Sequence, residues 1–308
     1  MTIHLGSLEA IEGLDAPCRR HPFEPRLHDA LAPDSGARFA AMASRALPES
    51  DLATAVLFGQ WIGWFADFDD QRDDGPLGSD TARLNRRYRD LLATVDRSPT
   101  QRYPRGGDEA FAGLWRQTAP RVGPQWTHRF RIGLREHWRG SLIEAANRQS
   151  SRVPTPAEFV QLRRITNGAM VLLLPEAMLR VDVPWRLAQS PAWRALVDAC
   201  NDVVGWCNDL ASVQRESARG DIHNFVLVIA HALGVSRASA AARVRERIAR
   251  RMLDMHHAAR FLPSTFDSLG LDRRTACDVS RVAVTFLATP RGHLEWLRES
   301  SRYAQKAA

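Results

Sequence analysis

The sequence predicts an all-α protein that forms a single domain over residues 1–308. Long segments repeat apolar residues at intervals of three and four positions, which places those residues on one face of a helix. No segment shows the period-two alternation and tight turns that indicate β-hairpins. The composition agrees with a folded globular chain, since 44% of the residues are hydrophobic and 25% are charged.

Seven segments of helical length follow this periodicity, and short turn-rich stretches separate them. In chain order they are residues 52–68, 126–148, 158–179, 193–216, 222–233, 238–261 and 273–288. Typical helix lengths allow roughly ten helices in the whole chain. Stretches such as TAVLFGQWIGWF and FVLVIAHAL are apolar on more than one face, so we expect a bundle around a central apolar cavity. Residues 1–40 show no clear pattern, and we expect an irregular segment there.

The charge balance is basic, with a net charge of +7 and a pI near 10. Among the 42 basic residues, Lys306 is the only lysine. The arginines are interspersed with acidic residues, as in RVRERIARR at 243–251, which is typical of a solvated helix face rather than a nucleic-acid-binding patch. We therefore expect no nucleic-acid partner.

Three further features concern the cellular location. No run of about eighteen apolar residues is present, so we expect no membrane span. The N-terminus lacks the cationic start and apolar run of a secretory signal. The four cysteines, Cys18, Cys200, Cys207 and Cys277, show neither CxxC spacing nor a disulfide framework. Together these features predict a cytoplasmic protein.

The first cluster of chemistry-bearing residues is DDQRD at residues 69–73. On a helix, Asp69 and Asp73 share a face, and Asp70 lies alongside. Three carboxylates within one turn repel one another unless a cation compensates, and hard oxygen ligands of this kind suit Mg²⁺. The alternative interpretation is a solvated, acidic helix end.

The second cluster is NDLASVQRE at residues 208–216. Asn208, Ser212 and Glu216 are spaced four residues apart, so they stack on one helical face. An amide, a hydroxyl and a carboxylate oxygen together suit a second hard cation. Arg215 lies next to this stripe and is suitable for binding a phosphate group. The alternative for this motif alone is a polar helix face with internal hydrogen bonds.

The two motifs, about 140 residues apart and in this order, resemble those of the class I terpene synthases, particularly the single-domain bacterial terpene cyclases. The resemblance covers roughly residues 23–303. LRRITNG at 162–168 is similar to the family's diphosphate-sensing segment, and RGHLEW with SSRY at 291–303 is similar to its C-terminal Arg-Tyr segment. The resemblance implies the helical bundle of the class I terpenoid synthases, with residues 1–40 as a segment that caps the active site.

This resemblance also implies a ligand set. In the family, three Mg²⁺ ions and basic residues bind the diphosphate of a linear isoprenoid, whose ionisation starts cyclisation; Mn²⁺ is the alternative ion. The implied metal ligands are Asp69, then Asp70 and Asp73 as ligands or their neighbours, and Asn208, Ser212 and Glu216. The implied diphosphate contacts are Arg215, Arg302, Tyr303 and one of two adjacent arginines. Spacing to Asn208 favours Arg163 and spacing to Gly168 favours Arg164; we prefer Arg163.

Candidates for the cavity wall come from helical spacing. Steps back from Asp69 place Phe65, Trp61 or Ile62, and Phe58 on the metal face, although an aromatic stripe can equally be ordinary core. Asn201 lies two turns before Asn208 and is a candidate for positioning a water molecule that a carbocation captures. A structural hydrogen bond to a neighbouring helix is the favoured interpretation of Asn201, because buried amides are usually satisfied locally.

The expected reaction is cyclisation of an isoprenyl diphosphate. The Asn-Ser-Glu stripe argues against chain-elongating isoprenyl diphosphate synthases, which resemble this fold but carry two aspartate-rich motifs. The DxDD of residues 67–70, a pattern of protonation-initiated class II cyclases, is interpreted as accidental overlap.

Farnesyl diphosphate is the expected substrate. Geranyl diphosphate is the alternative, because Trp61 and Trp64 would shrink the cavity, with water capture giving an alcohol or ether. A non-catalytic helical binding protein is the alternative from another class. The resemblance is compatible with a homodimer, because dimers are common in that fold, but the sequence does not determine the oligomeric state.

Overall fold

The computed structural model describes residues 37–48, 50–73, 75, 77–78, 80–97 and 108–299. These residues form helices joined by turns and loops, with no β-strand among them, which confirms the all-α prediction. The helices are α2 (Ala37–Ala46), α3 (Leu52–Asp73), α4 (Thr81–Val95), α5 (Glu109–Thr118), α6 (Pro124–Ser150), α7 (Pro156–Thr166), α8 (Leu174–Leu179), α9 (Trp185–Ala188), α10 (Pro191–Ala218), α11 (Phe225–Leu233), α12 (Arg237–Arg260), α13 (Leu262–Ser268) and α14 (Arg273–Glu299), with 3-10 turns η2 (Ala119–Arg121) and η3 (Val171–Leu173).

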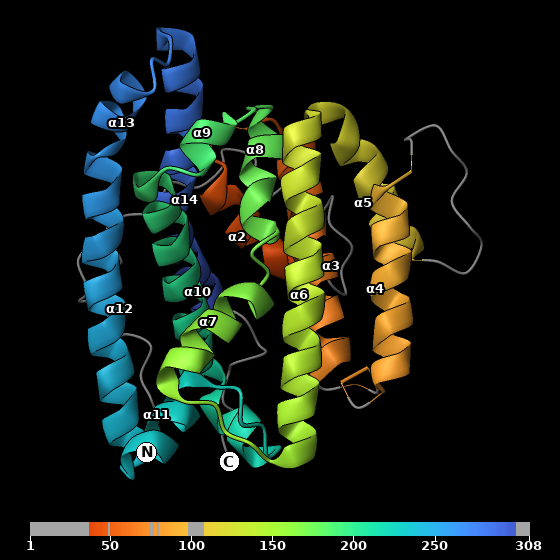
Figure 1. The fold of residues 1–308 in the computed structure, drawn as a ribbon, viewed down its shortest axis with the longest axis vertical. Helices are drawn as coiled ribbons and strands as arrows, with labels where there is room; N and C mark the ends of the chain where they lie inside the picture. The colour runs from red at the N-terminus through yellow and green to blue at the C-terminus, as the bar shows by residue number, and fades with distance from the viewer. Residues whose placement is uncertain are drawn as a thin grey trace.

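Helix α10 lies in the middle of the bundle, between α12 on one side and α6 on the other (Figure 1). It packs directly against α7, α11, α12 and α14. Helix α3 packs against α2, α5 and α8, and α6 bridges α4 and α7. The two predicted metal motifs are therefore carried by α3 and α10, which different sets of neighbours hold in place.

The starts of the key helices follow from local sequence chemistry. Ser190 caps α10 by accepting a hydrogen bond from the Trp193 amide, and Pro191 occupies the first turn. Helix α7 begins with a capping box in which Thr155 and Glu158 bond each other's backbone amides. The first metal motif is helical because α3 continues past Phe68 to Asp73.

The prediction of a single helix over residues 158–179 is wrong. Helix α7 ends at Thr166, and the chain continues through η3 into the short helix α8. Gly168 has φ = +79°, a left-handed conformation that few residues other than glycine adopt easily. A Cβ atom at this glycine would lie 2.5 Å from Cζ of Phe65, so a side chain would also collide with α3. The apolar run MVLLLPEAM concealed this break, because it continues the helical periodicity beyond the glycine.

Two other boundaries also differ from prediction. Within the predicted irregular segment 1–40, helix α2 already begins at Ala37; residues 1–36 lie outside the described residues. The last helix, α14, runs on to Glu299 with Pro290 in its interior, rather than ending at residue 288. A proline usually disrupts a helix interior, which is why the sequence pattern placed the end before it.

The apolar side chains of the described helices form one large connected core. An aromatic group of Trp115, Trp126 and Phe130 lies inside it, with ring centroids 5.0–6.2 Å apart. No single described helix is long and apolar enough to cross a membrane. Residues Phe225–Leu233 and Arg237–Ser268 meet that length and apolarity together, but they form a pair bent by 117°.

Candidate active site

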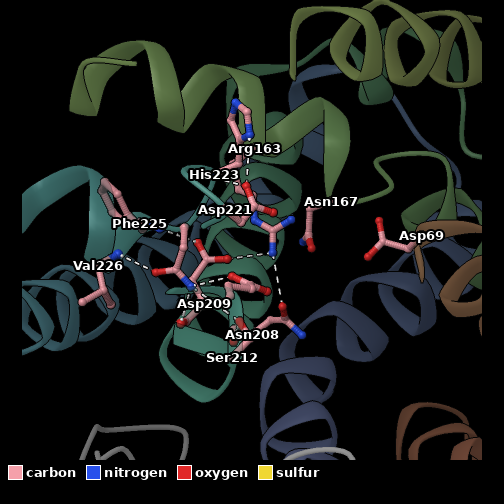
Figure 2. A network of polar contacts seen from close by, with 12 residues as sticks. Asp69, Arg163, Asn167, Asn208, Asp209, Ser212, Asp221, His223, Phe225 and Val226 are labelled. Atoms are coloured by element: carbon pink, nitrogen blue, oxygen red, sulfur yellow. Dashed lines mark hydrogen bonds and ion pairs between the residues drawn. The ribbon is translucent and has the colours of Figure 1, made fainter. Parts of the chain in front are cut away.

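Asn208, Ser212 and Glu216 are spaced four residues apart on α10, so they share one face of that helix. Figure 2 shows Asn208 and Ser212 on it. The Ser212 hydroxyl donates a hydrogen bond to the Asn208 carbonyl at 2.8 Å. Asn224, which precedes α11, donates from Nδ2 to Glu216 Oε2 at 2.8 Å and to the Asp209 carbonyl at 2.7 Å. Its own Oδ1 caps α11 by accepting from the Val226 amide. The start of α11 is thereby fixed to the stripe and orients the Glu216 carboxylate.

Arg163 projects from α7 into this stripe. Its Nη2 atom donates to Asp209 Oδ1 at 2.8 Å and to Asn208 Oδ1 at 3.3 Å (Figure 2). Gly205 permits the close approach of the two helices, because a Cβ there would lie 3.6 Å from Cγ of Arg163 and 3.1 Å from Nδ2 of Asn167. Arg163 therefore contacts the second motif directly.

Asp209 is one of the residues near the site that the sequence did not predict. Its side chain is buried, and besides Arg163 it accepts a hydrogen bond from the Phe225 amide at 3.2 Å. Burial raises the pKa of Asp209 to about 7, although the charge of Arg163 opposes the shift. The available signal was the residue's position one step from the stripe, which turns it toward α7 and α11 rather than along the stripe.

Arg164 points elsewhere. Its guanidinium forms two hydrogen bonds with Asp202, from Nε at 2.8 Å and from Nη2 at 2.7 Å, and a longer one with Asp198 at 3.4 Å. Arg251 of α12 binds the same Asp202 carboxylate at 2.8 Å. Of the two adjacent arginines, Arg163 reaches the motif and Arg164 joins α7 to α10.

The first motif is built around a buried arginine. Arg72 Nη2 contacts Asp69 Oδ1 at 2.5 Å, and Arg72 Nη1 lies 3.3 Å from Glu144 Oε2 and 3.2 Å from Ser141 Oγ, both on α6. Asp69 and Asp70 are partly exposed, and Asp73 is the last residue of α3. Arg72, which the sequence reasoning gave no role, joins Asp69 to α6.

A buried network supports Arg72 from behind. The Ser141 hydroxyl that accepts from Arg72 lies 2.8 Å from the Tyr88 hydroxyl, which in turn lies 2.5 Å from Nδ1 of His137. Burial raises the pKa of Tyr88 and lowers that of His137, so both groups are neutral near pH 7. Because Tyr88 and His137 are neutral, the negative charges that balance Arg72 in this network are those of Asp69 and Glu144.

The two motifs act electrostatically on the same arginine. Burial alone would lower the pKa of Arg163, but the charges of Asp209, Asp69, Glu216 and Glu144 outweigh it and raise that pKa. Asp69 lies across from Arg163 and Asn167, on a separate helix (Figure 2). Carboxylates on α3, α6 and α10 thus act on one guanidinium, and among them Asp209 bonds it directly.

The donor chemistry at this place fits a hard divalent cation. In the described part of the chain, no three Asp, Glu, His or Cys side chains lie close enough together to hold a metal ion. The α10 stripe instead offers an amide, a hydroxyl and one carboxylate oxygen, and Asp69 of α3 lies across from it (Figure 2). Mg²⁺ favours such a site, with few protein carboxylates, when an anionic ligand completes its coordination.

The three residues predicted to line the cavity wall differ in burial: two lie in the core and one is partly exposed. Trp61 is buried in the core, where its Nε1 donates to Thr118 Oγ1 at 2.8 Å, and Phe58 is buried as well. Phe65 is partly exposed, and its ring packs 5.5 Å from that of His137 and against Gly168. Among the three, Phe65 combines partial exposure with proximity to the break between α7 and α8.

Asn201 makes hydrogen bonds to a neighbouring helix, as its favoured interpretation as a structural residue expects. Its Nδ2 donates to the Arg164 carbonyl at 2.8 Å, and its Oδ1 accepts from Asn167 at 2.8 Å. Because both ends of the amide are engaged, Asn201 joins α10 to the end of α7, and positioning a water molecule would require breaking one of these bonds.

The remaining predicted diphosphate contacts are only partly described. Arg215 directly precedes Glu216 on α10, and its Nη2 lies 3.5 Å from Glu216 Oε1. Arg302 and Tyr303 lie outside the described residues, and so does the side chain of Asp73. His293, on α14, is buried, and burial together with the nearby charge of Arg163 lowers its pKa to about 3.

A helical bundle that turns an aspartate-rich helix and an Asn-Ser-Glu helix toward one largely buried arginine has the fold and site of a class I terpene synthase. The chain belongs to terpene synthase family 2, whose model, described as "Terpene synthase family 2, C-terminal metal binding", matches residues 60–254. That match contains both motifs, as well as Arg163 and Asn224.

Individual relatives agree with this assignment. The (-)-delta-cadinene synthase of Streptomyces clavuligerus is 31% identical over 258 residues, 83% of this chain and 77% of the relative. A (-)-beta-caryophyllene synthase of Saccharothrix espanaensis, named as cyclizing (2E,6E)-farnesyl diphosphate, is 26% identical over 291 residues, 91% of this chain and 81% of the relative. Among solved structures, a single-residue variant of cucumene synthase superposes with a TM-score of 0.80 at 26% identity, covering 94% of this chain and 99% of that one. The chain is therefore a terpene synthase.

Proposed function

We propose that the protein ionises farnesyl diphosphate with the help of Mg²⁺ and cyclises the resulting cation to a sesquiterpene, releasing diphosphate. In this proposal residues 1–308 form one terpene synthase domain with an apolar cavity beside the two motifs. The observation that carries it is the convergence of Asp69 from α3 and the Asn208–Glu216 stripe of α10 on Arg163. Metal ions bound there would neutralise the charge that develops on the departing diphosphate.

Each residue near the site has a distinct task in this proposal. Asn208, Ser212 and Glu216 would hold one metal ion, and Asp69, with Asp70 or Asp73, would hold the others. Arg163 and Arg215 would donate hydrogen bonds to diphosphate oxygens, because guanidinium groups bind phosphate in fixed, charge-assisted geometry. Asn224 would keep Glu216 oriented toward the metal rather than toward solvent.

The carbocation then requires an environment without a competing nucleophile. The C–O bond to diphosphate breaks, the allylic cation closes a ring on a distant double bond, and loss of a proton gives the neutral product. Phe65, partly exposed next to Gly168, offers an aromatic ring that can stabilise a cation by about 0.5–2 kcal/mol.

Farnesyl diphosphate is favoured over geranyl diphosphate. The names of the relatives support a fifteen-carbon substrate, as for the enzyme named for cyclizing (2E,6E)-farnesyl diphosphate. The argument for the shorter substrate weakens in the structure, because Trp61 bonds Thr118 in the core and Trp64 donates to Asp108 at 2.8 Å. Both indoles have structural partners, which account for these residues without a role in narrowing a cavity.

The test is to incubate the purified protein with geranyl, farnesyl and geranylgeranyl diphosphates, with Mg²⁺ or EDTA, and to identify volatile products by gas chromatography–mass spectrometry. We expect cyclic products from farnesyl diphosphate that disappear with EDTA. A cyclic product from geranyl diphosphate alone would replace the substrate assignment. If all three substrates gave only the alcohols that form without enzyme, the proposed catalysis would be wrong.

A further inference from the structure

Arg72 is an arginine inside the first metal motif, and its side chain is buried. That side chain is only 1% exposed, whereas the Asp69 side chain one turn earlier on α3 is 29% exposed. The Nη2 atom of Arg72 donates to Asp69 Oδ1 at 2.5 Å. A fixed positive charge beside a candidate metal ligand repels a cation, so an arginine at this place requires an explanation.

The other end of the same guanidinium is fixed on α6. Nη1 of Arg72 donates to Ser141 Oγ at 3.2 Å and lies 3.3 Å from Glu144 Oε2. Both of these side chains are buried, and the Ser141 hydroxyl is itself bonded to the His137 carbonyl at 2.8 Å. Because the N–H groups of a guanidinium point in fixed directions, holding Nη1 on α6 also sets the direction of the bond from Nη2 to Asp69.

The direction in which Asp69 is held is that of the α10 site. In Figure 2 the Asp69 carboxylate points toward the side of the site where Arg163 and Asn167 lie. Like charges one turn apart on a helix repel, so the neighbouring carboxylates of the motif would favour other rotamers of an unrestrained Asp69. A side chain already held in one rotamer loses less conformational entropy when it binds a ligand.

From this arrangement we propose that Arg72 is a positioning residue: by holding Asp69 between α3 and α6, it strengthens the binding of metal and diphosphate, although its own charge opposes a cation. This inference rests on the proposed function for the role of Asp69 as a metal ligand. Partners that orient a metal ligand commonly contribute about ten- to a hundredfold to metal affinity. The two effects of Arg72 have opposite signs, because losing the charge alone tightens cation binding and losing the positioning weakens it.

The experiment measures binding without turnover. Isothermal titration calorimetry would record the binding of inorganic pyrophosphate to the full-length protein in a fixed excess of MgCl₂, for wild type, Arg72→Met, Asp69→Asn and the double variant. Arg72→Met should weaken binding by about tenfold or more. The double variant should bind within about twofold of Asp69→Asn, because an arginine that acts through Asp69 contributes nothing once that carboxylate is gone.

Arg129→Met is the matched control. Arg129 forms a comparably buried ion pair with Glu176, but this pair joins α6 to α8 and lies outside both motifs. The variant should be less stable than wild type, yet its pyrophosphate affinity should stay within about twofold.

Arg72→Lys is the second variant, for the case that Arg72→Met does not fold. It keeps a positive charge beside the buried Glu144 but lacks the fork that bridges the two helices, so it should also weaken binding, by about threefold or more. It then replaces Arg72→Met in the comparison with Asp69→Asn.

Two results would overturn the inference. One is pyrophosphate binding by the Arg72 variant that equals or exceeds that of wild type, since the charge of Arg72 would then be its main effect. The other is a double variant in which the two losses multiply, because Arg72 would then act without Asp69. A wild-type protein that bound no pyrophosphate with MgCl₂ would contradict the proposed function itself, so the two failures are distinguishable.

Discussion

At the scale of single residues, Asn224 shows how a side chain outside both motifs shapes the site. It caps α11 through Oδ1 and holds Glu216 through Nδ2, so one amide serves a helix start and a candidate metal ligand together. Its side chain is fully buried. An aspartate at this position would place a second carboxylate against Glu216 and lose the donor, which is why an amide suits it.

Gly168 provides a prediction at the same scale. We expect Gly168→Ala to lower the free energy of unfolding by about 2–4 kcal/mol, because left-handed backbone strain adds to the displacement of the Phe65 ring. Gly270→Ala is the control: Gly270 has φ = +65°, but a Cβ atom there would meet no atom within 4 Å, so only the strain of about 1–2 kcal/mol applies. Urea unfolding measures both, and equal losses would show that the Phe65 contact has no energetic weight.

The predictions for single residues were limited because periodicity gives the helix face of a residue but not its partners on other helices. Asn208, Ser212 and Glu216 follow a spacing of four, so the sequence could place them on one face of α10. Asp209 and Arg72 were missed as site residues because their roles depend on partners from other helices, Arg163 and Glu144. Spacing to Asn208 favoured Arg163 and spacing to Gly168 favoured Arg164, with Arg163 preferred; the packing of α7 on α10 gives the two arginines different partners.

At the scale of helices, Asp202 joins three elements. It lies on α10, is 3% exposed, and receives hydrogen bonds from Arg164 of α7 and Arg251 of α12. This contact fixes the rotation of α7 about its axis, and the next residue back along α7 is Arg163. The orientation of the arginine at the site therefore depends on an ion pair made by its neighbour in the chain.

We expect Asp202→Asn to destabilise the protein by about 1–3 kcal/mol. The value is smaller than for a fully buried ion pair, because the side chains of Arg164 and Arg251 are 24% and 20% exposed and can be partly hydrated. Asp254→Asn is the control, since Asp254 pairs with Arg251 but is 49% exposed and should cost less than about 1 kcal/mol. Chemical denaturation distinguishes the two, and equal losses would contradict the role of Asp202 as the joining residue.

The sequence predicted the long helices correctly but missed the helix break at Gly168. Segments 193–216 and 238–261 agree with α10 and α12 to within a few residues, because their apolar stripes are long and their caps are clear. The break at Gly168 was missed because the apolar run after it continues the helical periodicity, and the Phe65 ring that a Cβ atom would meet at this φ = +79° glycine comes from α3. A contact so distant in sequence leaves no local pattern.

For the whole molecule, the fold brings together two motifs that lie far apart in the chain. Helices α3 and α10 contribute donors from opposite sides, and α7 inserts Arg163 beside them. Neither motif forms a metal-binding cluster of acidic, histidine or cysteine side chains by itself within the described residues. Under the proposed function, catalysis is therefore a property of the assembled bundle, with metal and diphosphate joining the two sides.

The most direct test of this central claim is the rate of pyrophosphate release from farnesyl diphosphate by wild type and by Glu216→Gln. We expect release by wild type only with Mg²⁺, and a loss of at least about a hundredfold in Glu216→Gln, because removing one charge that acts on a transition state commonly costs that much. Glu246→Gln, at an exposed position on α12, should retain the wild-type rate. Release that persisted in EDTA, or an unchanged rate in Glu216→Gln, would contradict metal-dependent catalysis at the assembled site.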